Sequence, residues 1–309
     1  MNTLLILGAS LFLIVRGATL STTYAIRLSR SLELPRYTVG FLVVSAISIL
    51  PELLIAIISS LTNVPEFALG VLFGSNIADL TLIFALIILL TGRALSVQKS
   101  TLKDNELYIF LLLMPVLLGL DGYFSRTDGI LLIAAGVFFY YQSLKNRRAS
   151  HAGSGTQTHN YYRTFFLLLL AIGMLLTGAY LAVSSASALA TTLGVSPVLI
   201  GMFIVGLGTT LPELFFSLKS HQRHNDALAE GDLLGTVLVD ATIVVGTLAA
   251  VSPFAFPKSI MYITGAFMVA AAFFLFYLMR SDRTLTKREG FFLFLFWVAF
   301  LATELLFGA

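Results

Sequence analysis

GFLVVSAISILPELLIAIISSLTNVPEFALGVLFGSNIAD, residues 40–79, and GMFIVGLGTTLPELFFSLKSHQRHNDALAEGDLLGTVLVD, residues 201–240, are two versions of one stretch. Adding 161 to a position in the first copy gives its partner in the second without a gap, so Glu52 pairs with Glu213. Each copy carries Leu-Pro-Glu-Leu inside an apolar run and an Asp 27 residues after the Glu. Four acidic residues therefore stand at matched positions in segments that are otherwise apolar.

The composition is that of a membrane protein. Hydrophobic residues make up 58% of the chain and charged residues 11%, and the mean hydropathy is +0.93, whereas soluble domains carry about 25% charged residues. The absence of cysteine excludes disulfides and thiolate metal sites. The N-terminal stretch MNTLLILGASLFLIV lacks the basic region and cleavage site of a signal peptide, so we expect it to be a retained first helix.

Ten apolar runs are long enough to approach or cross a hydrocarbon core of about 30 Å. They cover residues 3–27, 37–60, 66–92, 106–121, 127–144, 163–190, 198–218, 227–252, 258–280 and 289–308. We therefore predict an all-α, polytopic membrane protein with ten transmembrane helices. A polar, basic linker at 146–162 separates a first five-helix half at 1–145 from a second five-helix half at 163–309.

Positive charge is concentrated in alternate loops. The loops after the odd-numbered spans hold 16 Lys and Arg residues, and the opposite side holds only Arg126 and Lys258. This bias predicts a multi-pass plasma-membrane protein with both termini outside and the central linker in the cytoplasm. Because each half has an odd number of spans, the halves would cross the membrane in opposite directions as inverted repeats, which place their binding site near the midplane on broken helices.

The repeated prolines, Pro51 and Pro212, predict where the helices break. Proline has no N–H donor and clashes with the carbonyl four residues earlier, so the carbonyls of Ile47 and Gly208 would be released. Irregular backbone at membrane depth is tolerated where it is buried in protein or lines a cavity. Each released carbonyl precedes a repeat glutamate by about one turn, which places the predicted site there.

The candidate ligands all offer oxygen. They are the carboxylates of Glu52, Asp79, Glu213 and Asp240, with the hydroxyls or amide of Ser48, Ser75, Asn76, Thr209, Thr210 and Thr236. Such a set suits Ca²⁺, which takes 6–8 oxygens and tolerates irregular geometry, better than Mg²⁺, which resists dehydration. All four histidines lie in predicted loops, which disfavours softer metals.

The four carboxylates need compensation. A charged group at the bilayer centre costs roughly 2.5–3.5 kcal/mol on insertion scales, so four would cost on the order of 10 kcal/mol without cations or protons. Asp79 and Asp240 are repeat partners, and if they face each other we expect them to share a proton.

The duplicated Leu-Pro-Glu-Leu elements, followed by GSNIAD and GTVLVD, resemble the two alpha-repeats of the cation/Ca²⁺ exchanger superfamily, and most closely its prokaryotic Na⁺/Ca²⁺ exchanger branch. The resemblance covers nearly the whole chain. It implies a secondary antiporter that exchanges Ca²⁺ for Na⁺ by alternating access, with the first and sixth helices sliding over the other eight. Glu52, Glu213 and Asp240 match the family's carboxylates, whereas Asp79 stands where many members have Asn.

Two departures from the family pattern concern the counter-ion. Family members usually have Gly-Thr-Ser before Leu-Pro-Glu, but the first copy here has Ile47-Ser48-Ile49, so Ile49 removes a hydroxyl expected to help bind one Na⁺. Val237 replaces a common Asn. The extra Asp79 would favour H⁺, or K⁺ as a co-ion, over one of the Na⁺ ions. An H⁺/Ca²⁺ or K⁺-dependent exchanger therefore stays open as the alternative.

A different class, the intramembrane aspartyl proteases, also uses two membrane aspartates. Its Gly-Xaa-Gly-Asp signature is absent at Asp79 and Asp240, so we expect a transporter and not an enzyme. We expect no cofactor besides the transported ions, no nucleic-acid partner, the lipid bilayer as surroundings, and function as a monomer.

Glu230, Asp232 and Glu304 are further acidic residues in predicted spans. We expect Glu230 and Asp232 to begin their span and to stabilise a helix N-terminus, with a role in admitting cations as the alternative. Glu304 lies near the outer end of the last span, so we expect it at the membrane interface.

Overall fold

The computed structural model describes residues 2–31, 49–97, 105–146, 161–280 and 283–307. The first half contains α1 (Asn2–Ser31), α4 (Leu50–Leu61), α5 (Pro65–Ala78), the π-helical turn η2 (Asp79–Ile83), α6 (Phe84–Thr91), β1 (Leu95–Ser96), α8 (Asn105–Leu118), β2 (Tyr123–Phe124) and α9 (Arg126–Asn146). The second half contains α10 (Tyr161–Leu193), α11 (Pro197–Ile200), η3 (Gly201–Val205), α12 (Gly206–Thr209), α13 (Leu211–Gln222), α14 (Asp226–Val239), η4 (Asp240–Val244), α15 (Val245–Val251), β3 (Phe254–Ala255), η5 (Ile260–Gly265), α16 (Ala266–Arg280), β4 (Thr284–Leu285) and α17 (Lys287–Phe307).

The predicted all-α membrane architecture is confirmed. Seven helical segments of the described chain are long and apolar enough to cross a membrane, and two further apolar helices, Leu50–Leu61 and Glu106–Leu118, are shorter. The first part of the span predicted at 37–60 lies outside the described residues, as does most of the predicted linker at 146–162. Elsewhere a helix or a run of consecutive helices occupies each predicted span.

The repeat seen in the sequence recurs in the helix bounds. Helix α4 begins and ends 161 residues before α13, and α5 begins and ends 161 residues before α14. A π-helical turn follows each of the latter two, starting at Asp79 and at Asp240. π-Helical turns are rare and are frequently found at functional sites. Both repeats therefore have a π-helical turn at the aspartate that they share.

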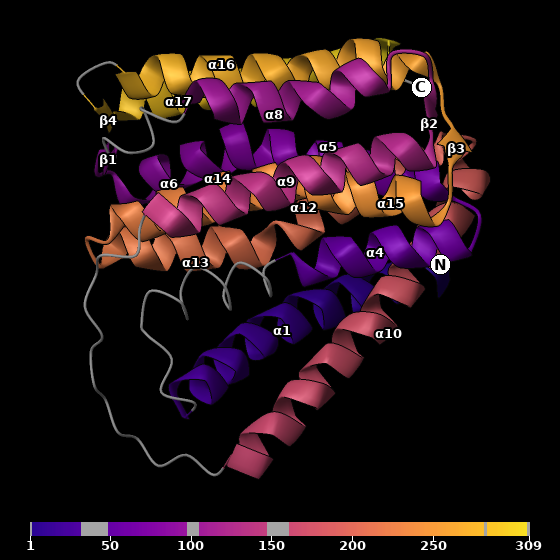
Figure 1. The fold of residues 1–309 in the computed structure, drawn as a ribbon, viewed down its shortest axis with the longest axis horizontal. Helices are drawn as coiled ribbons and strands as arrows, with labels where there is room; N and C mark the ends of the chain where they lie inside the picture. The colour runs from indigo at the N-terminus through magenta and orange to yellow at the C-terminus, as the bar shows by residue number, and fades with distance from the viewer. Residues whose placement is uncertain (1, 32–48, 98–104, 147–160, 281–282, 308–309) are drawn as a thin grey trace.

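Two short strand pairs join the halves at opposite ends of the molecule (Figure 1). β1 pairs with β4, and β2 pairs with β3, each time one strand from each half. Strand β4 stands 161 residues after β2, so the two strands are counterparts in the repeat. Because these counterparts lie at opposite ends of the molecule, the halves run in opposite directions, as an inverted repeat requires.

Helices α1 and α10 pack against each other along one side of the molecule (Figure 1). A Cβ added at Gly17 would lie 2.9 Å from Leu175 Cγ, and one added at Gly178 would lie 2.9 Å from Ile14 Cγ1. These contacts are reciprocal, since Leu175 is the repeat partner of Ile14 and Gly178 that of Gly17. Small residues let membrane helices approach closely, so the glycines fix the crossing point of this pair.

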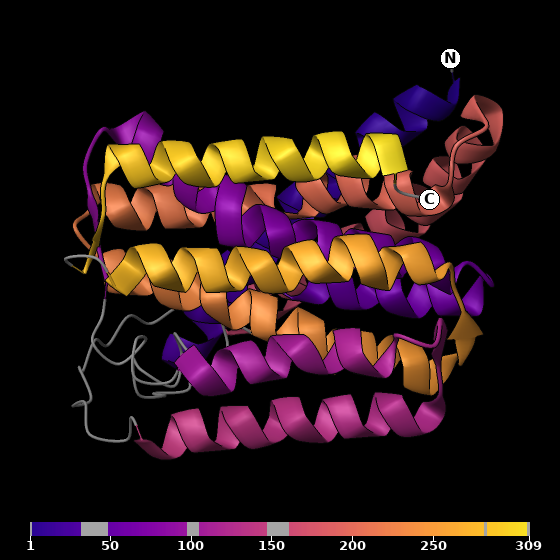
Figure 2. The same cartoon turned by 90° about the horizontal axis from the view of Figure 1, so that it is seen from above.

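The remaining helices enclose α5. On one side, α17, α16, α8 and α9 run side by side in that order (Figure 2). On the other, a Cβ at Gly74 would lie only 2.6 Å from Met202 Cγ, so α5 lies directly against η3. The segment Pro65–Thr91 is the most deeply buried of the candidate spans. Its polar residues are therefore shielded from lipid by protein.

Candidate ion site

The repeat prolines stand at the start of helices. Pro51 and Pro212 occupy the first turns of α4 and α13, where a missing N–H leaves no helical hydrogen bond unmade. Pro212 cannot donate to the Gly208 carbonyl, and the chain divides there into α12 and α13; Ile47 lies outside the described residues. Glu52 and Glu213 also lie in these first turns, where the helix dipole favours negative charge.

The four repeat carboxylates are buried and close together. Exposure is 2% for Glu52, 1% for Asp79, 3% for Glu213 and 0% for Asp240. The charge of Glu52 repels those of Asp79, Glu213 and Asp240, and the charge of Asp79 repels those of Glu213 and Asp240. The segments that carry them are linked by contacts, since α4 with Glu52 touches η4 with Asp240, and both η2 with Asp79 and α13 with Glu213 touch α14. The two repeats thus bring their acids into one electrostatically coupled cluster.

Several oxygens of this cluster lack a donor. Buried atoms without a hydrogen-bond partner among the described residues include Glu52 Oε2, Asn76 Oδ1, Asp79 Oδ1, Glu213 Oε2, Thr236 Oγ1 and both carboxylate oxygens of Asp240. A buried acceptor left unpaired costs about 1–3 kcal/mol, so such a concentration is unfavourable without a partner. Oxygen is the ligand that a hard cation prefers, so a bound cation would satisfy these acceptors.

The hydroxyl and amide groups leave their oxygens free to act as ligands. Ser75, Thr209 and Thr210 each donate to a carbonyl three residues earlier in their own helix, at 3.0 Å in every case. Their lone pairs remain available as acceptors. Asn76 donates its Nδ2 to Met268 Sδ at 3.7 Å, which leaves Oδ1 as the free end of the amide. The other predicted hydroxyl, that of Ser48, lies outside the described residues.

These oxygens do not form a closed coordination sphere. Within the described part of the chain, no three His, Asp or Glu side chains converge closely enough to hold a metal ion. Ca²⁺–oxygen distances of about 2.3–2.6 Å require ligands that nearly touch. The cluster is thus close enough for its charges to interact and too open for contact ligation by three carboxylates.

Tyr108 is also part of this environment, although its own segment carries no motif that would select it. The side chain is 5% exposed, and its hydroxyl has no hydrogen-bond partner among the described residues. Asp79 and Asp240 both act electrostatically on this phenol. It comes from α8, which contacts η4. A phenol can donate to a carboxylate, which makes Tyr108 a candidate donor to the aspartates.

Asp232 also belongs to the cluster, and the expectation that it begins its helix is wrong. Helix α14 begins at Asp226, so Asp232 lies in its second turn, with 8% exposure. Its charge repels those of Asp79 and Glu213. Glu230 is fully buried in the same helix and likewise lies beyond the first turn. The effect of the helix dipole is largely confined to the terminal turn. Stabilisation of the helix N-terminus therefore does not explain why either acid lies at its position.

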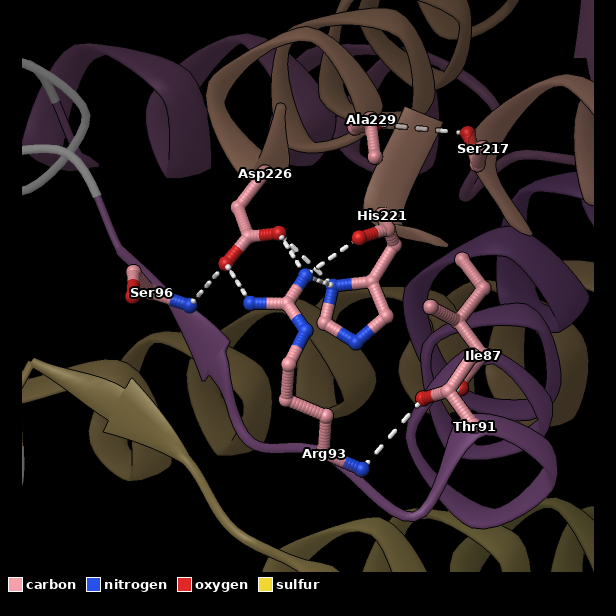
Figure 3. A network of polar contacts seen from close by, with 8 residues as sticks. All are labelled: Ile87, Thr91, Arg93, Ser96, Ser217, His221, Asp226 and Ala229. Atoms are coloured by element: carbon pink, nitrogen blue, oxygen red, sulfur yellow. Dashed lines mark hydrogen bonds and ion pairs between the residues drawn. The ribbon is translucent and has the colours of Figure 1, made fainter. Parts of the chain in front are cut away.

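A polar network holds the β1–β4 end of the molecule together (Figure 3). Arg93 contacts Asp226 through Nη2–Oδ1 at 2.6 Å and Nη1–Oδ2 at 3.1 Å, and it donates to the His221 carbonyl. The His221 Nδ1 lies 2.7 Å from Asp226 Oδ1, and the Ser96 backbone N–H donates to Asp226 Oδ2 at 2.9 Å. The network fixes the connection between α13 and α14, both of which carry site acids.

Glu304, which we expect at the membrane interface, is buried within the protein near the end of α17. Its exposure is 2%, and Thr264 Oγ1 in η5 donates to Glu304 Oε1 at 2.7 Å. The side chain turns from α17 toward the neighbouring helix because η5 offers a hydroxyl there. This hydrogen bond satisfies one of the two carboxylate oxygens of Glu304, which lies outside the repeat-derived cluster.

Comparison with known proteins identifies relatives along the whole chain. The sequence model of a family described as "sodium/calcium exchanger protein" matches residues 2–144 and again residues 163–306. An uncharacterized membrane protein of Methanocaldococcus jannaschii, MJ0091, is 28% identical over 79% of this chain and 83% of its own length. The inner membrane protein YrbG of Escherichia coli is 29% identical over 81% and 79%.

A solved structure shares the fold. The sodium-calcium exchanger NCX_Mj, soaked with 2.5 mM Na⁺ and 10 mM Sr²⁺, superposes with a TM-score of 0.70 at 22% identity and covers 97% of this chain and 99% of its own. The match spans both halves, so the arrangement of helices agrees from end to end.

Proposed function

Because this chain belongs to the sodium/calcium exchanger family, we propose that it exchanges Ca²⁺ for Na⁺ across the plasma membrane by alternating access. The family and the structural relatives are transporters and not enzymes, so a protease function has no support. The observation that carries the proposal is the cluster of buried, mutually repelling carboxylates with unpaired oxygens. Such a cluster is stabilised by a cation that replaces the missing donors.

The transported cation would occupy the space among the two glutamates and two aspartates, with the neighbouring hydroxyls and the Asn76 amide completing its ligands. Binding would draw the carboxylates together, since a divalent charge outweighs their mutual repulsion. Helices α1 and α10 would move relative to the rest, because they pack mainly against each other and only a small part of each is buried. No resident cofactor is needed for this cycle, and one chain contains the whole proposed site.

Two features favour a counter-ion or co-ion other than Na⁺. Asp79 is buried and its charge is repelled by that of Glu52, and Ile49, where a hydroxyl would help bind Na⁺, is only partly buried at the N-cap of α4. Both support H⁺ as the counter-ion, or K⁺ as a co-ion, as the second candidate. The two candidates differ in the gradient that drives Ca²⁺.

Ca²⁺ uptake into proteoliposomes distinguishes them. Vesicles containing the purified chain are loaded with Na⁺ and diluted into Na⁺-free medium with ⁴⁵Ca²⁺, and parallel vesicles carry a pH gradient alone, with or without K⁺. Uptake driven by the Na⁺ gradient and abolished in Glu213→Gln supports the first proposal. Uptake driven by the pH gradient alone replaces it with H⁺/Ca²⁺ exchange, and no uptake under any gradient contradicts both.

A further inference from the structure

Asp232 lies between the repeat-derived cluster and one end of the molecule. It follows the first residue of α14, Asp226, by six positions and precedes Asp240 by eight. At 1.5 Å per residue, it is about 9 Å along the helix from Asp226 and about 12 Å from Asp240. Asp226 is part of the network at the β1–β4 end (Figure 3). A cation moving between that end and the cluster would therefore pass the level of Asp232.

The side of α14 that carries Asp232 is turned toward α13. Ala229 and Asp232 are three residues apart, so they share a helix face. The Ala229 carbonyl accepts a hydrogen bond from Ser217 Oγ of α13 at 3.5 Å, and Figure 3 shows these residues opposite each other. Ser217 follows Glu213 by one turn, and both are buried. Asp232 and Glu213 thus lie along the same helix interface.

Unpaired oxygens accompany Asp232 on this interface. Thr236 follows it by one turn on the same face, is 3% exposed, and its hydroxyl has no hydrogen-bond partner among the described residues. Glu213 Oε2 also lacks a partner within that part of the chain, and its charge is repelled by that of Asp232. Two buried oxygens without donors therefore lie beside the Asp232 carboxylate, and this arrangement suits a bound cation.

Only the second repeat has these polar groups. The partner of Asp232 is Val71, which is fully buried, and the partner of Ser217 is Ala56. The first half thus offers apolar groups where the second half offers a carboxylate and a hydroxyl. Any extra cation affinity from Asp232 acts on the side of the cluster that faces the β1–β4 end, which the charge bias predicts to be cytoplasmic.

We propose that Asp232, together with Glu213 and Thr236, forms an additional cation subsite between the central cluster and the β1–β4 end, and that it favours divalent over monovalent cations. This inference rests on the proposed function, because Glu213 and Thr236 are shared with the central site. The preference follows from charge, since a carboxylate attracts a divalent ion twice as strongly as a monovalent ion at the same distance.

Binding of Ca²⁺ and of Na⁺ to the purified full chain tests the subsite. Equilibrium ⁴⁵Ca²⁺ and ²²Na⁺ binding is measured for the wild type, Asp232→Asn, Asp232→Glu and a control, Glu66→Gln, which removes a half-buried acid from the first turn of α5. We expect Asp232→Asn to weaken Ca²⁺ binding about tenfold and Na⁺ binding about threefold, because the Coulomb energy scales with ion charge. Asp232→Glu keeps the charge and should recover most of the Ca²⁺ affinity.

The outcomes separate this inference from the proposed function. Unchanged Ca²⁺ affinity in Asp232→Asn, or an equal loss for Ca²⁺ and Na⁺, overturns the subsite, because a merely structural role would not discriminate by ion charge. If Glu213→Gln loses Ca²⁺ binding in the same series, the central site stands without the subsite. A wild type that binds neither ion contradicts both proposals.

Discussion

Replacing Glu52 by Gln should have opposite effects on the stability of the protein with and without Ca²⁺. The charge of Glu52 repels those of Asp79, Glu213 and Asp240. At a separation on the order of 8 Å and an effective dielectric constant of about 20, one such repulsion is worth about 2 kcal/mol. Coupled carboxylates bind protons and do not all ionise together. We therefore expect the substitution to remove about one such repulsion and to stabilise the ion-free variant by that amount.

The assay is thermal unfolding of the purified chain in detergent at pH 9, with a chelator or with Ca²⁺. A change of 1 kcal/mol shifts the Tm of chains of about 150–250 residues by about 2–4 °C, so the Tm of the variant in chelator should rise by about 5 °C. Ca²⁺ at 100 times its Kd should stabilise the wild type by about 2.7 kcal/mol. The variant should gain much less from Ca²⁺, since it has lost a ligand charge.

Glu66→Gln is the matched control, because Glu66 is an acid in the same repeat that lies outside the coupled cluster. Its unfolding should follow that of the wild type in both conditions. The reasoning is refuted if Glu52→Gln lowers the transition in chelator, or if Ca²⁺ stabilises it as much as the wild type. Either result would show that Glu52 stabilises the fold itself and does not await a cation.

Three further predictions concern other parts of the cluster and its support. Asp79→Asn should preserve Ca²⁺ transport in proteoliposomes and weaken its dependence on pH; an unchanged pH profile would argue against a proton shared with Asp240. Tyr108→Phe should lower the apparent Ca²⁺ affinity of transport by less than about tenfold, since it removes one hydrogen-bond donor worth about 1 kcal/mol; a loss of folding instead would assign the phenol a structural role. Arg93→Ala should destabilise the chain by about 1–2 kcal/mol, because Asp226 loses the guanidinium and keeps only the Ser96 N–H and His221 as partners. Unfolding in denaturant would measure this, and equal stability of the variant and wild type would contradict it.

The exact offset between the repeats made much of the fold predictable. It placed Glu52 with Glu213 and Asp79 with Asp240 before any coordinates, and the helix bounds of α4 and α13 follow the same offset. Pro212 also marks a helix break, because α12 ends before it and α13 begins there, and Pro51 likewise lies in the first turn of α4. Proline is well tolerated in a first turn, which the local sequence could not distinguish from a kink.

Features that depend on contacts between distant helices could not be predicted. Tyr108 reaches the aspartates because α8 packs against η4, and its own segment gives no sign of this. Asp232 was expected to stabilise a helix start, but α14 begins six residues earlier. Glu304 is buried because Thr264 in the neighbouring η5 offers a hydrogen bond. Each of these positions is set by tertiary packing, which a single-sequence periodicity does not encode.

Anomalous scattering from crystals soaked in Sr²⁺ tests the central claim most directly, because Sr²⁺ is a heavy analogue of Ca²⁺. The account predicts a strong peak among the carboxylates of Glu52, Asp79, Glu213 and Asp240, with their oxygens drawn to ligand distances. Strontium bound elsewhere, with these carboxylates still apart, would contradict the assignment of this cluster as the site of transport.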